Sequence, residues 1–166
     1  MTRTSFEQAL KKGGAGEAII KQYLESKGWV VYQPTTGGAH CFDMMSIKDK
    51  KTAIALDVKA KARMNKYPAT GVNLTHFNEY KNFSEKHSMP FWIIFVDEMQ
   101  MSIYGNSLDE LEKPITVDGV RYPMTMYSKL RLWPLVNMKI IATITKEQAA
   151  QLKELNQRNY NYEAVT

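Results

Sequence analysis

The sequence of 166 residues contains a single cysteine, Cys41, and three histidines. One cysteine excludes a disulfide framework and any zinc site built from several cysteines. No apolar run has the length that a membrane-spanning helix needs, and the first residues lack the apolar core of a signal peptide. We therefore expect a cytoplasmic protein with no membrane partner, or one in the host-cell cytoplasm if a phage encodes it.

The composition is that of an ordinary globular protein, with 44% hydrophobic and 23% charged residues. A chain of this length predicts one domain with a substantial core. The net charge of +5 and the isoelectric point near 9.2 permit an anionic partner such as nucleic acid but do not require one. The basic residues cluster before the first expected helix and after residue 58, and a solvated basic face explains this distribution equally well.

Two short strands, at residues 42–47 and 52–59, are predicted on either side of a polar turn. Successive side chains of a strand point to opposite faces. One face of the second strand therefore carries small and charged side chains, those of Ala53, Ala55, Asp57 and Lys59. The other face carries the apolar side chains of Ile54, Leu56 and Val58. If the turn is centred near Lys50, Asp43 lies opposite Asp57.

Two ionised carboxylates in cross-strand positions would lie ~5 Å apart and repel by roughly 3 kcal/mol at an effective dielectric of 20. A divalent cation offsets this repulsion best, because Mg²⁺ prefers oxygen ligands and is held by one or two carboxylates plus substrate phosphate. Lys59, on the same face, could contact a phosphate or the attacking water. The alternative is structural: two solvent-facing aspartates at strand ends, with Lys59 as a surface partner.

A helix is predicted over residues 15–27, with Gly28 as its left-handed stop. Its inward stripe includes Ile20 and Leu24. Glu17 precedes Ile20 by three residues, so a carboxylate lies at the N-terminal end of the buried stripe. An acidic residue in a first turn is also favoured by the helix dipole alone, and both readings remain open.

The rest of the sequence predicts alternating helices and strands. Strands are expected over 29–33, 91–96, 100–104 and 139–144, a hairpin with an Asp-Gly turn over 115–122, and helices over 74–86 and after the cap Thr145. Residues 60–72 are predicted to form a loop. Residues 1–14 are predicted to form a basic arm with a short helical piece ending at Gly13-Gly14. A core over 15–105 follows, then an extension of the same domain over 106–157 and a tail over 158–166.

Taken together, the order of these motifs resembles the PD-(D/E)xK nuclease superfamily, and within it the Holliday junction resolvases of the archaeal and RecU-like kinds. Glu17 matches the acid of the family's first helix, Asp43 the acid of its second strand, and Asp57-Val58-Lys59 its (D/E)-x-K. The segment Thr35-Thr36-Gly37-Gly38 is similar to the Ser/Thr-Gly segment of resolvases, and His76 falls where related enzymes place a Gln or His. Phe42 stands where the name-giving proline would be.

The resemblance implies an α/β, restriction-endonuclease-like fold with a central mixed β-sheet flanked by helices, and hydrolysis of DNA phosphodiesters assisted by Mg²⁺ or Mn²⁺. Asp43, Asp57 and the Val58 carbonyl would bind metal, Glu17 would hold a second ion or orient water, and Lys59 would position the attacking group or stabilise charge on the phosphate. The residues expected to contact DNA are Lys11, Lys12, Thr35, Thr36, His40, Lys61, Arg63, Lys66 and His76.

The substrate and assembly stay open at this point. The first hypothesis is an endonuclease selective for branched DNA, of a phage or mobile-element type. It would act as a symmetric homodimer if both strands are cut in a coordinated way. The second is a restriction or repair nuclease acting on ordinary duplex, and the third is a nuclease-like domain that binds DNA or protein without cutting.

Overall fold

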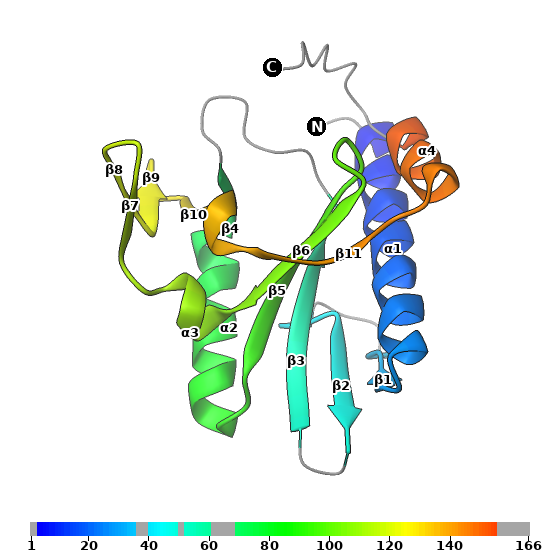
Figure 1. Ribbon diagram of the computed structural model, residues 1–166, viewed down its shortest axis with the longest axis horizontal. Coiled ribbons are helices and arrows are strands. Elements are labelled where there is room, and N and C mark those ends of the chain that lie inside the picture. The colour runs from blue at the N-terminus through cyan, green and yellow to red at the C-terminus, as the bar shows by residue number, and fades with distance from the viewer. Residues whose placement is uncertain (1–2, 36–39, 50–51, 61–68, 156–166) are drawn as a thin grey trace.

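A six-stranded mixed sheet, in the order β1-β2-β3-β5-β6-β11, forms the centre of the protein (Figure 1). The computed structural model describes residues 3–35, 40–49, 52–60 and 69–155, with side chains from Phe6 onward. β3 and β5 are parallel and the other neighbours are antiparallel. The strands are β1 (Val30–Tyr32), β2 (Met44–Lys48), β3 (Thr52–Lys59), β5 (Phe91–Asp97), β6 (Ser102–Ser107) and β11 (Lys139–Thr143).

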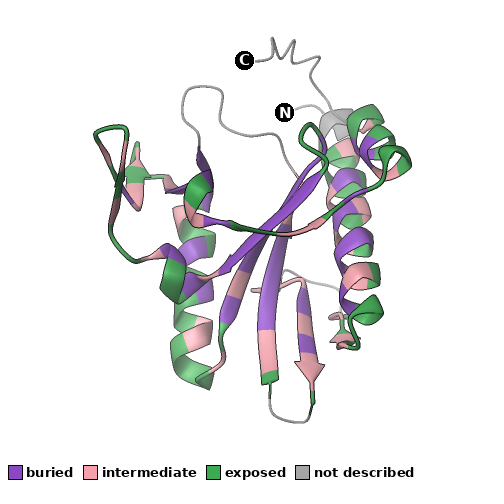
Figure 2. Ribbon diagram, viewed as in Figure 1, coloured by how far each residue is buried: buried purple, intermediate pink, exposed green. Residues whose placement is uncertain are grey.

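Helices cover both faces of this sheet, as predicted. Helices α1 (Arg3–Ser26) and α4 (Lys146–Glu154) lie on one face, and α2 (Leu74–His87) and α3 (Leu108–Leu111) on the other (Figure 1). β5 contributes Ile94 and Val96 to the first core and Ile93 and Phe95 to the second, so it is buried on both faces (Figure 2). Its continuous apolar sequence follows from this central position.

The register between β2 and β3 is the one predicted from the polar turn. Met44 pairs with Leu56 and Lys48 pairs with Thr52. Ala55 accordingly belongs to the core beneath α2, whereas Leu56 and Val58 belong to the core beneath α1. Since Asp57 shares a face with Ala55, its side chain is directed toward α2.

The first helix corrects one prediction, because α1 continues through Gly13-Gly14 instead of beginning after them. Glycine inside a helix costs about 1 kcal/mol relative to alanine, and tertiary packing here outweighs that cost. Lys12 donates to Glu98 just after β5, with 2.6 Å between Nζ and Oε1, and both side chains are buried. Lys12 therefore faces the interior rather than the surface on which a DNA contact was expected.

β4 and four strands after residue 107 build two small sheets, the larger of which packs on α2. One has the order β4-β10-β9 and the other pairs β7 with β8. Trp133 of β10 packs on Phe77 of α2, with ring centroids 6.1 Å apart. Part of the predicted loop 60–72 is therefore strand: β4 begins at Ala69. The strands are β4 (Ala69–Asn73), β7 (Ile115–Val117), β8 (Val120–Tyr122), β9 (Met124–Met126) and β10 (Leu130–Pro134), and a 3₁₀ turn, η1 (Leu135–Asn137), follows β10.

Local signals at the turns and caps are confirmed. Asp118 and Gly119 have φ of 49° and 76° in the β7–β8 turn, as a two-residue hairpin loop requires. Thr145 and Gln148 form the predicted capping box of α4, and Gly28 has a left-handed φ of 80° after α1. None of the described helices combines the length and the apolar character of a membrane-spanning segment.

Candidate active site

The candidate site lies at the C-terminal end of β3, where β2 no longer runs alongside it. Asp43 immediately precedes β2, and its backbone N–H donates to the Leu56 carbonyl at 3.0 Å. Its side-chain Oδ2 accepts a hydrogen bond from the Val58 N–H at 2.7 Å. Asp43 is therefore attached to β3 on both sides of Asp57, which fixes the two carboxylates as neighbours.

Helix α1 brings Glu17 to the same corner because Gly16 lets the helix approach the strand end. A Cβ atom added at Gly16 would lie 2.6 Å from the Ala60 Cβ and 3.7 Å from a Val58 methyl group. Real Cβ atoms do not come that close, so the helix would have to move away from β3. Glu17 is the next residue, and its position depends on this contact.

Gly16→Ala is therefore expected to destabilise the protein by about 1–3 kcal/mol, the usual cost of overpacking a tight contact, and to displace Glu17. Gly14→Ala is the matched control, because Gly14 lies in the same helix and an added Cβ meets nothing within 4 Å. That variant is expected to gain roughly 0.5–1 kcal/mol from helix propensity. Urea unfolding of both variants measures the difference, and equal effects would contradict the close contact.

The carboxylates at this corner perturb one another. Burial, and then the charge of Asp57, raise the pKa of Asp43 to about 7, although the Val58 N–H and Lys59 act in the opposite direction. Burial and the charge of Asp57 also raise the pKa of Glu17, again opposed by Lys59. The structure thus brings together the three acids that were singled out in the sequence and places Lys59 beside them.

Lys59 is the cation that neutralises this corner in the structure. Its Nζ lies 2.9 Å from Asp57 Oδ1 and 2.7 Å from Asp57 Oδ2. Asp57 itself is 4% exposed. Oδ2 is buried and accepts no hydrogen bond of acceptable angle, so the shorter contact to Lys59 is electrostatic rather than directional.

The donor set suits a hard divalent cation, which prefers carboxylate oxygens. Asp43 keeps a proton near neutral pH that a bound cation would displace, and Asp57 Oδ2 lacks a directional partner. No three Asp, Glu, His or Cys side chains within the described residues converge into a preformed ligand set. The residues therefore fit such an ion by chemistry, and Lys59 holds Asp57 in the arrangement seen here.

Tyr80 of α2 also lies near this corner, although it was not among the site residues predicted from the sequence. It is 2% exposed. Burial, and then the charge of Asp57, raise the pKa of its hydroxyl. An apolar stripe on a helix predicts that a ring is buried, but it gives no information about which charged group lies near the hydroxyl.

The described residues expected to contact DNA lie on the surface, apart from Lys12. Lys11, Thr35, His40 and His76 are all exposed. His40 lies three residues before Asp43, and the ring of His76 is 6.3 Å from that of Tyr80. Thr36, Lys61, Arg63 and Lys66 lie outside the described residues.

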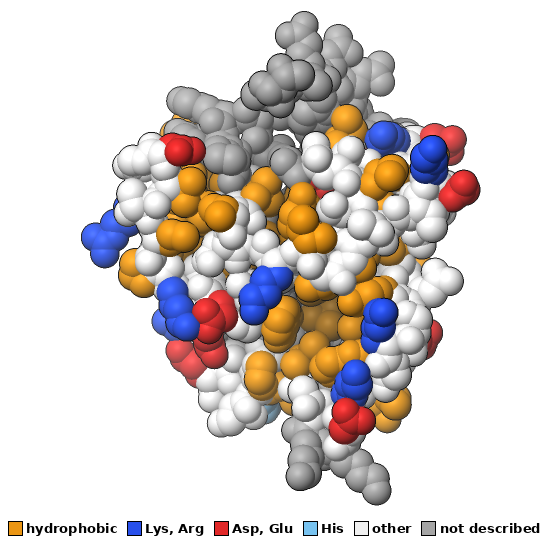
Figure 3. Space-filling view, in the orientation of Figure 1, with side chains coloured by type: hydrophobic (Ala, Val, Ile, Leu, Met, Phe, Trp, Pro, Cys, Tyr) orange, Lys and Arg blue, Asp and Glu red, His pale blue; other side chains and the backbone are white. Residues whose placement is uncertain are grey.

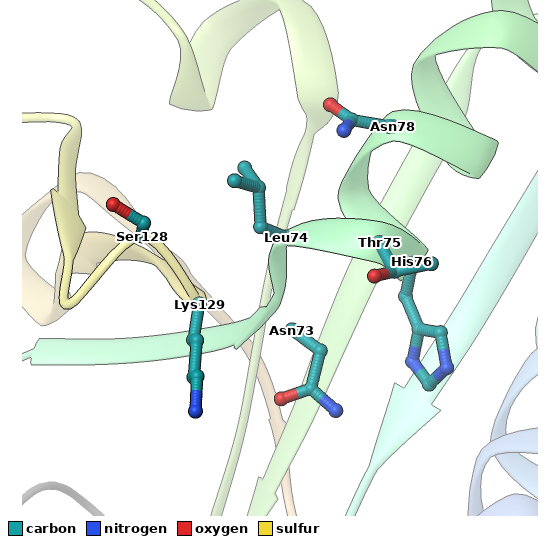
Figure 4. A pocket seen from close by; sticks show the side chains of 7 residues that line it. All are labelled: Asn73, Leu74, Thr75, His76, Asn78, Ser128 and Lys129. Atoms are coloured by element: carbon teal, nitrogen blue, oxygen red, sulfur yellow. The ribbon is translucent and has the colours of Figure 1, made fainter.

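His76 also borders an open hollow of about 510 Å³ at the start of α2 (Figure 4). The side chains of Asn73, His76 and Lys129 extend from the chain in the same direction there, and Asn78 points away from them. Lys129 comes from the segment between β9 and β10, which sequence reasoning left without a role. The hollow is lined by Asn73, Leu74, Thr75, His76, Asn78, Ser128 and Lys129.

The face shown in Figure 3 has a different character. Hydrophobic side chains gather near its centre, over the region where β11 crosses in front of the sheet, and the described lysines and arginines lie singly around them. Charge on this part of the surface is therefore dispersed rather than concentrated in one basic patch.

No protein-family model and no curated protein matches the chain. Among solved structures it is similar to Hjc, a Holliday junction resolvase from the archaeal hyperthermophile Archaeoglobus fulgidus, with a TM-score of 0.55 and 14% identity over 82% of this chain and 99% of the other. The chain has the fold of this resolvase. It is also similar to D212, a nuclease from a fusselovirus, with a TM-score of 0.46 and 14% identity over 89% and 92% of the two chains.

This shared fold confirms the predicted fold class. The six-stranded sheet, with helices on both faces, is the central mixed sheet that the motif order implied. Within this fold the described acids come from α1, from the residue before β2 and from the end of β3, the order in which the sequence motifs were matched.

Proposed function

We propose that this chain is a divalent-metal-dependent endonuclease that hydrolyses DNA phosphodiester bonds, with branched DNA as its preferred substrate. The observation that carries the proposal is the coupled group of Glu17, Asp43 and Asp57 beside Lys59 at the open end of β3. The shared fold with an archaeal Holliday junction resolvase supports it and suggests the substrate.

Asp43, Asp57 and Glu17 would hold Mg²⁺ or Mn²⁺, together with the Val58 carbonyl. In a strand the N–H and C=O of one residue face the same edge, and the Val58 N–H faces Asp43. Its carbonyl is therefore on the side of the site. When bound, the ion lowers the pKa of a water molecule and neutralises charge that develops on the phosphate.

The remaining steps belong to the side chains of the chain itself. Asp43 releases its proton on loading, because its pKa near 7 reflects burial beside other carboxylates. The Val58 N–H keeps the Asp43 carboxylate oriented. Lys59 would exchange its contact with Asp57 for a phosphate oxygen or the attacking water, since its side chain is 25% exposed and can be reached from solvent.

DNA contacts are proposed on the exposed side chains around this corner. Lys11, Thr35, His40 and His76 would contact the sugar-phosphate backbone, as would Thr36, Lys61, Arg63 and Lys66 outside the described residues. Lys129 beside His76 extends this set. Such contacts are independent of base sequence and sensitive to salt. Coordinated cutting of two strands would require a homodimer. We also propose that the protein acts in the cytoplasm.

Cleavage of a synthetic four-way junction, compared with a linear duplex of the same arm sequence in MgCl₂, tests the proposal. We expect the junction to be cut faster, and cleavage to stop when EDTA removes the metal. Equal rates on both substrates would favour a duplex nuclease. Binding of DNA without cleavage of either substrate would indicate a non-cleaving module and overturn the proposal.

A further inference from the structure

The hairpin that joins β9 to β10 carries an exposed aromatic ring at its tip. Tyr127 stands there and is 83% exposed. The apolar side chains on either side of the tip, Met126 and Leu130, pack instead against the core of the two small sheets. A ring that lies almost entirely in water removes little apolar surface from solvent, so Tyr127 contributes little to folding through burial.

The backbone at this tip has a conformation that tyrosine rarely adopts. Tyr127 and Ser128 have φ of 52° and 53°, and the Lys129 N–H donates to the Met126 carbonyl at 3.1 Å. Two-residue hairpin loops with positive φ at both positions favour glycine, asparagine and aspartate, and a bulky residue there is an outlier. Local strain of this kind clusters at functional sites. A ligand of the ring therefore explains Tyr127 better than the fold does.

The hairpin tip is fixed beside the hollow at the start of α2. The Leu74 N–H donates to the Lys129 carbonyl at 2.8 Å, which attaches the hairpin to the helix. Ser128 and Lys129, the two residues after Tyr127, line the hollow of about 510 Å³ together with residues of α2 and its cap. None of the described side chains that line it carries a negative charge. An anionic ligand would therefore meet Lys129 without repulsion from the lining.

The hollow also lies close to the acids of the candidate site. The ring of His76, on its border, is 6.3 Å from the ring of Tyr80, which lies near those acids. The side chains of Asn73, His76 and Lys129 extend in the same direction (Figure 4). A DNA backbone bound at the acids would thus pass Lys129 and His76, and its bases would come within reach of Tyr127.

We propose that Tyr127 is a specificity-determining residue, whose ring stacks on an uncovered DNA base at a branch point while Lys129 and His76 bind the adjoining phosphates. This inference rests on the proposed function. Inside a duplex both faces of a base are covered by its neighbours, whereas a branch point exposes base faces. Aromatic rings bind such faces whatever the base. The hairpin tip would therefore distinguish branched from linear DNA.

Fluorescence anisotropy tests this with a labelled four-way junction and a linear duplex of the same arm sequence, in EDTA so that neither is cut. Wild type should bind the junction more tightly than the duplex. Tyr127→Asn should lose roughly 5- to 150-fold in affinity for the junction, the range for stacking one base on an aromatic ring, and keep its affinity for the duplex. Asparagine suits a left-handed backbone, so the variant should melt at or above the wild-type temperature.

Two further variants separate stacking from charge. Tyr127→Phe is the matched control, because it keeps the ring, and it should bind the junction as wild type does. Lys129→Gln should weaken binding to both DNAs alike and reduce the slope of log affinity against log salt by about 1, as expected for the loss of one phosphate contact.

Junction affinity of Tyr127→Asn equal to that of wild type, or an equal loss on both DNAs, would overturn the inference and leave the proposed nuclease intact. A loss in Tyr127→Phe as large as that in Tyr127→Asn would also overturn it, because the hydroxyl and not the ring would then make the contact. Cleavage is measured separately in MgCl₂. A wild-type protein that binds the junction without cutting it would overturn the proposed function, and the binding comparison would still decide the role of Tyr127.

Discussion

Asp57→Asn is expected to reduce cleavage by roughly 10³-fold or more, within the range observed when one member of a cooperating catalytic group is removed. Asparagine has nearly the same shape, but it lacks the charge that binds a cation. Neutralising Asp57 lowers the pKa of Glu17 and Asp43, whose carboxyls its charge perturbs, but it leaves the site with one anionic ligand fewer for the cation. Initial rates on a four-way junction in MgCl₂ measure the effect.

The loss should not come from unfolding. Removing the Asp57 charge leaves Lys59 without its partner, but that ammonium is partly exposed, so water can solvate it in the variant. Relief of the repulsion with Asp43 acts in the stabilising direction, so the melting temperature of the metal-free variant should equal or exceed that of wild type. Asp109→Asn, at an exposed carboxylate of α3, serves as the control. Cleavage by Asp57→Asn at the wild-type rate would exclude Asp57 from the reaction.

The part of the site on β2 and β3 could be predicted because residues close together in the sequence determine it. A single polar turn sets the register between Met44 and Leu56, and alternation then decides which side chains share the face of Asp57. Glu17 was predictable in the same way, from its place on a helical stripe. What local pattern could not supply was the contact of Gly16 with Ala60, which brings the helix to the strand.

The elements that were predicted wrongly depend on distant partners. β4 reads as loop because its pairing partner is β10, where Gly71 meets Leu132. Gly13-Gly14 is typical of a helix break because glycine is a poor helix former, yet Lys12 beside it is held by Glu98, which lies 86 residues further along the chain. In both cases tertiary contacts override a local preference.

Asp43→Asn is expected to stabilise the metal-free protein at pH 8 and to have little effect at pH 4. In the folded protein the pKa of Asp43 is about 7, against an ordinary value of 3.8. Between these values the folded state binds more protons than the unfolded state, so stability falls as pH rises. The difference between these two pKa values corresponds to a loss of at most roughly 4 kcal/mol in the free energy of unfolding. Asparagine keeps an acceptor for the Val58 N–H and does not ionise, so it removes this loss.

The difference in unfolding free energy between wild type and Asp43→Asn isolates Asp43 from the other acids, because those titrate in both proteins. Urea unfolding from pH 4 to pH 8 in EDTA should show wild type losing stability relative to the variant as pH rises through this window. Added MgCl₂ should restore wild type at pH 8 and leave Asp43→Asn nearly unchanged, because a cation replaces the proton only where the carboxylate is present. A difference that stays constant with pH would mean that Asp43 ionises freely in the fold. Repulsion between the carboxylates would then not favour the binding of a metal ion.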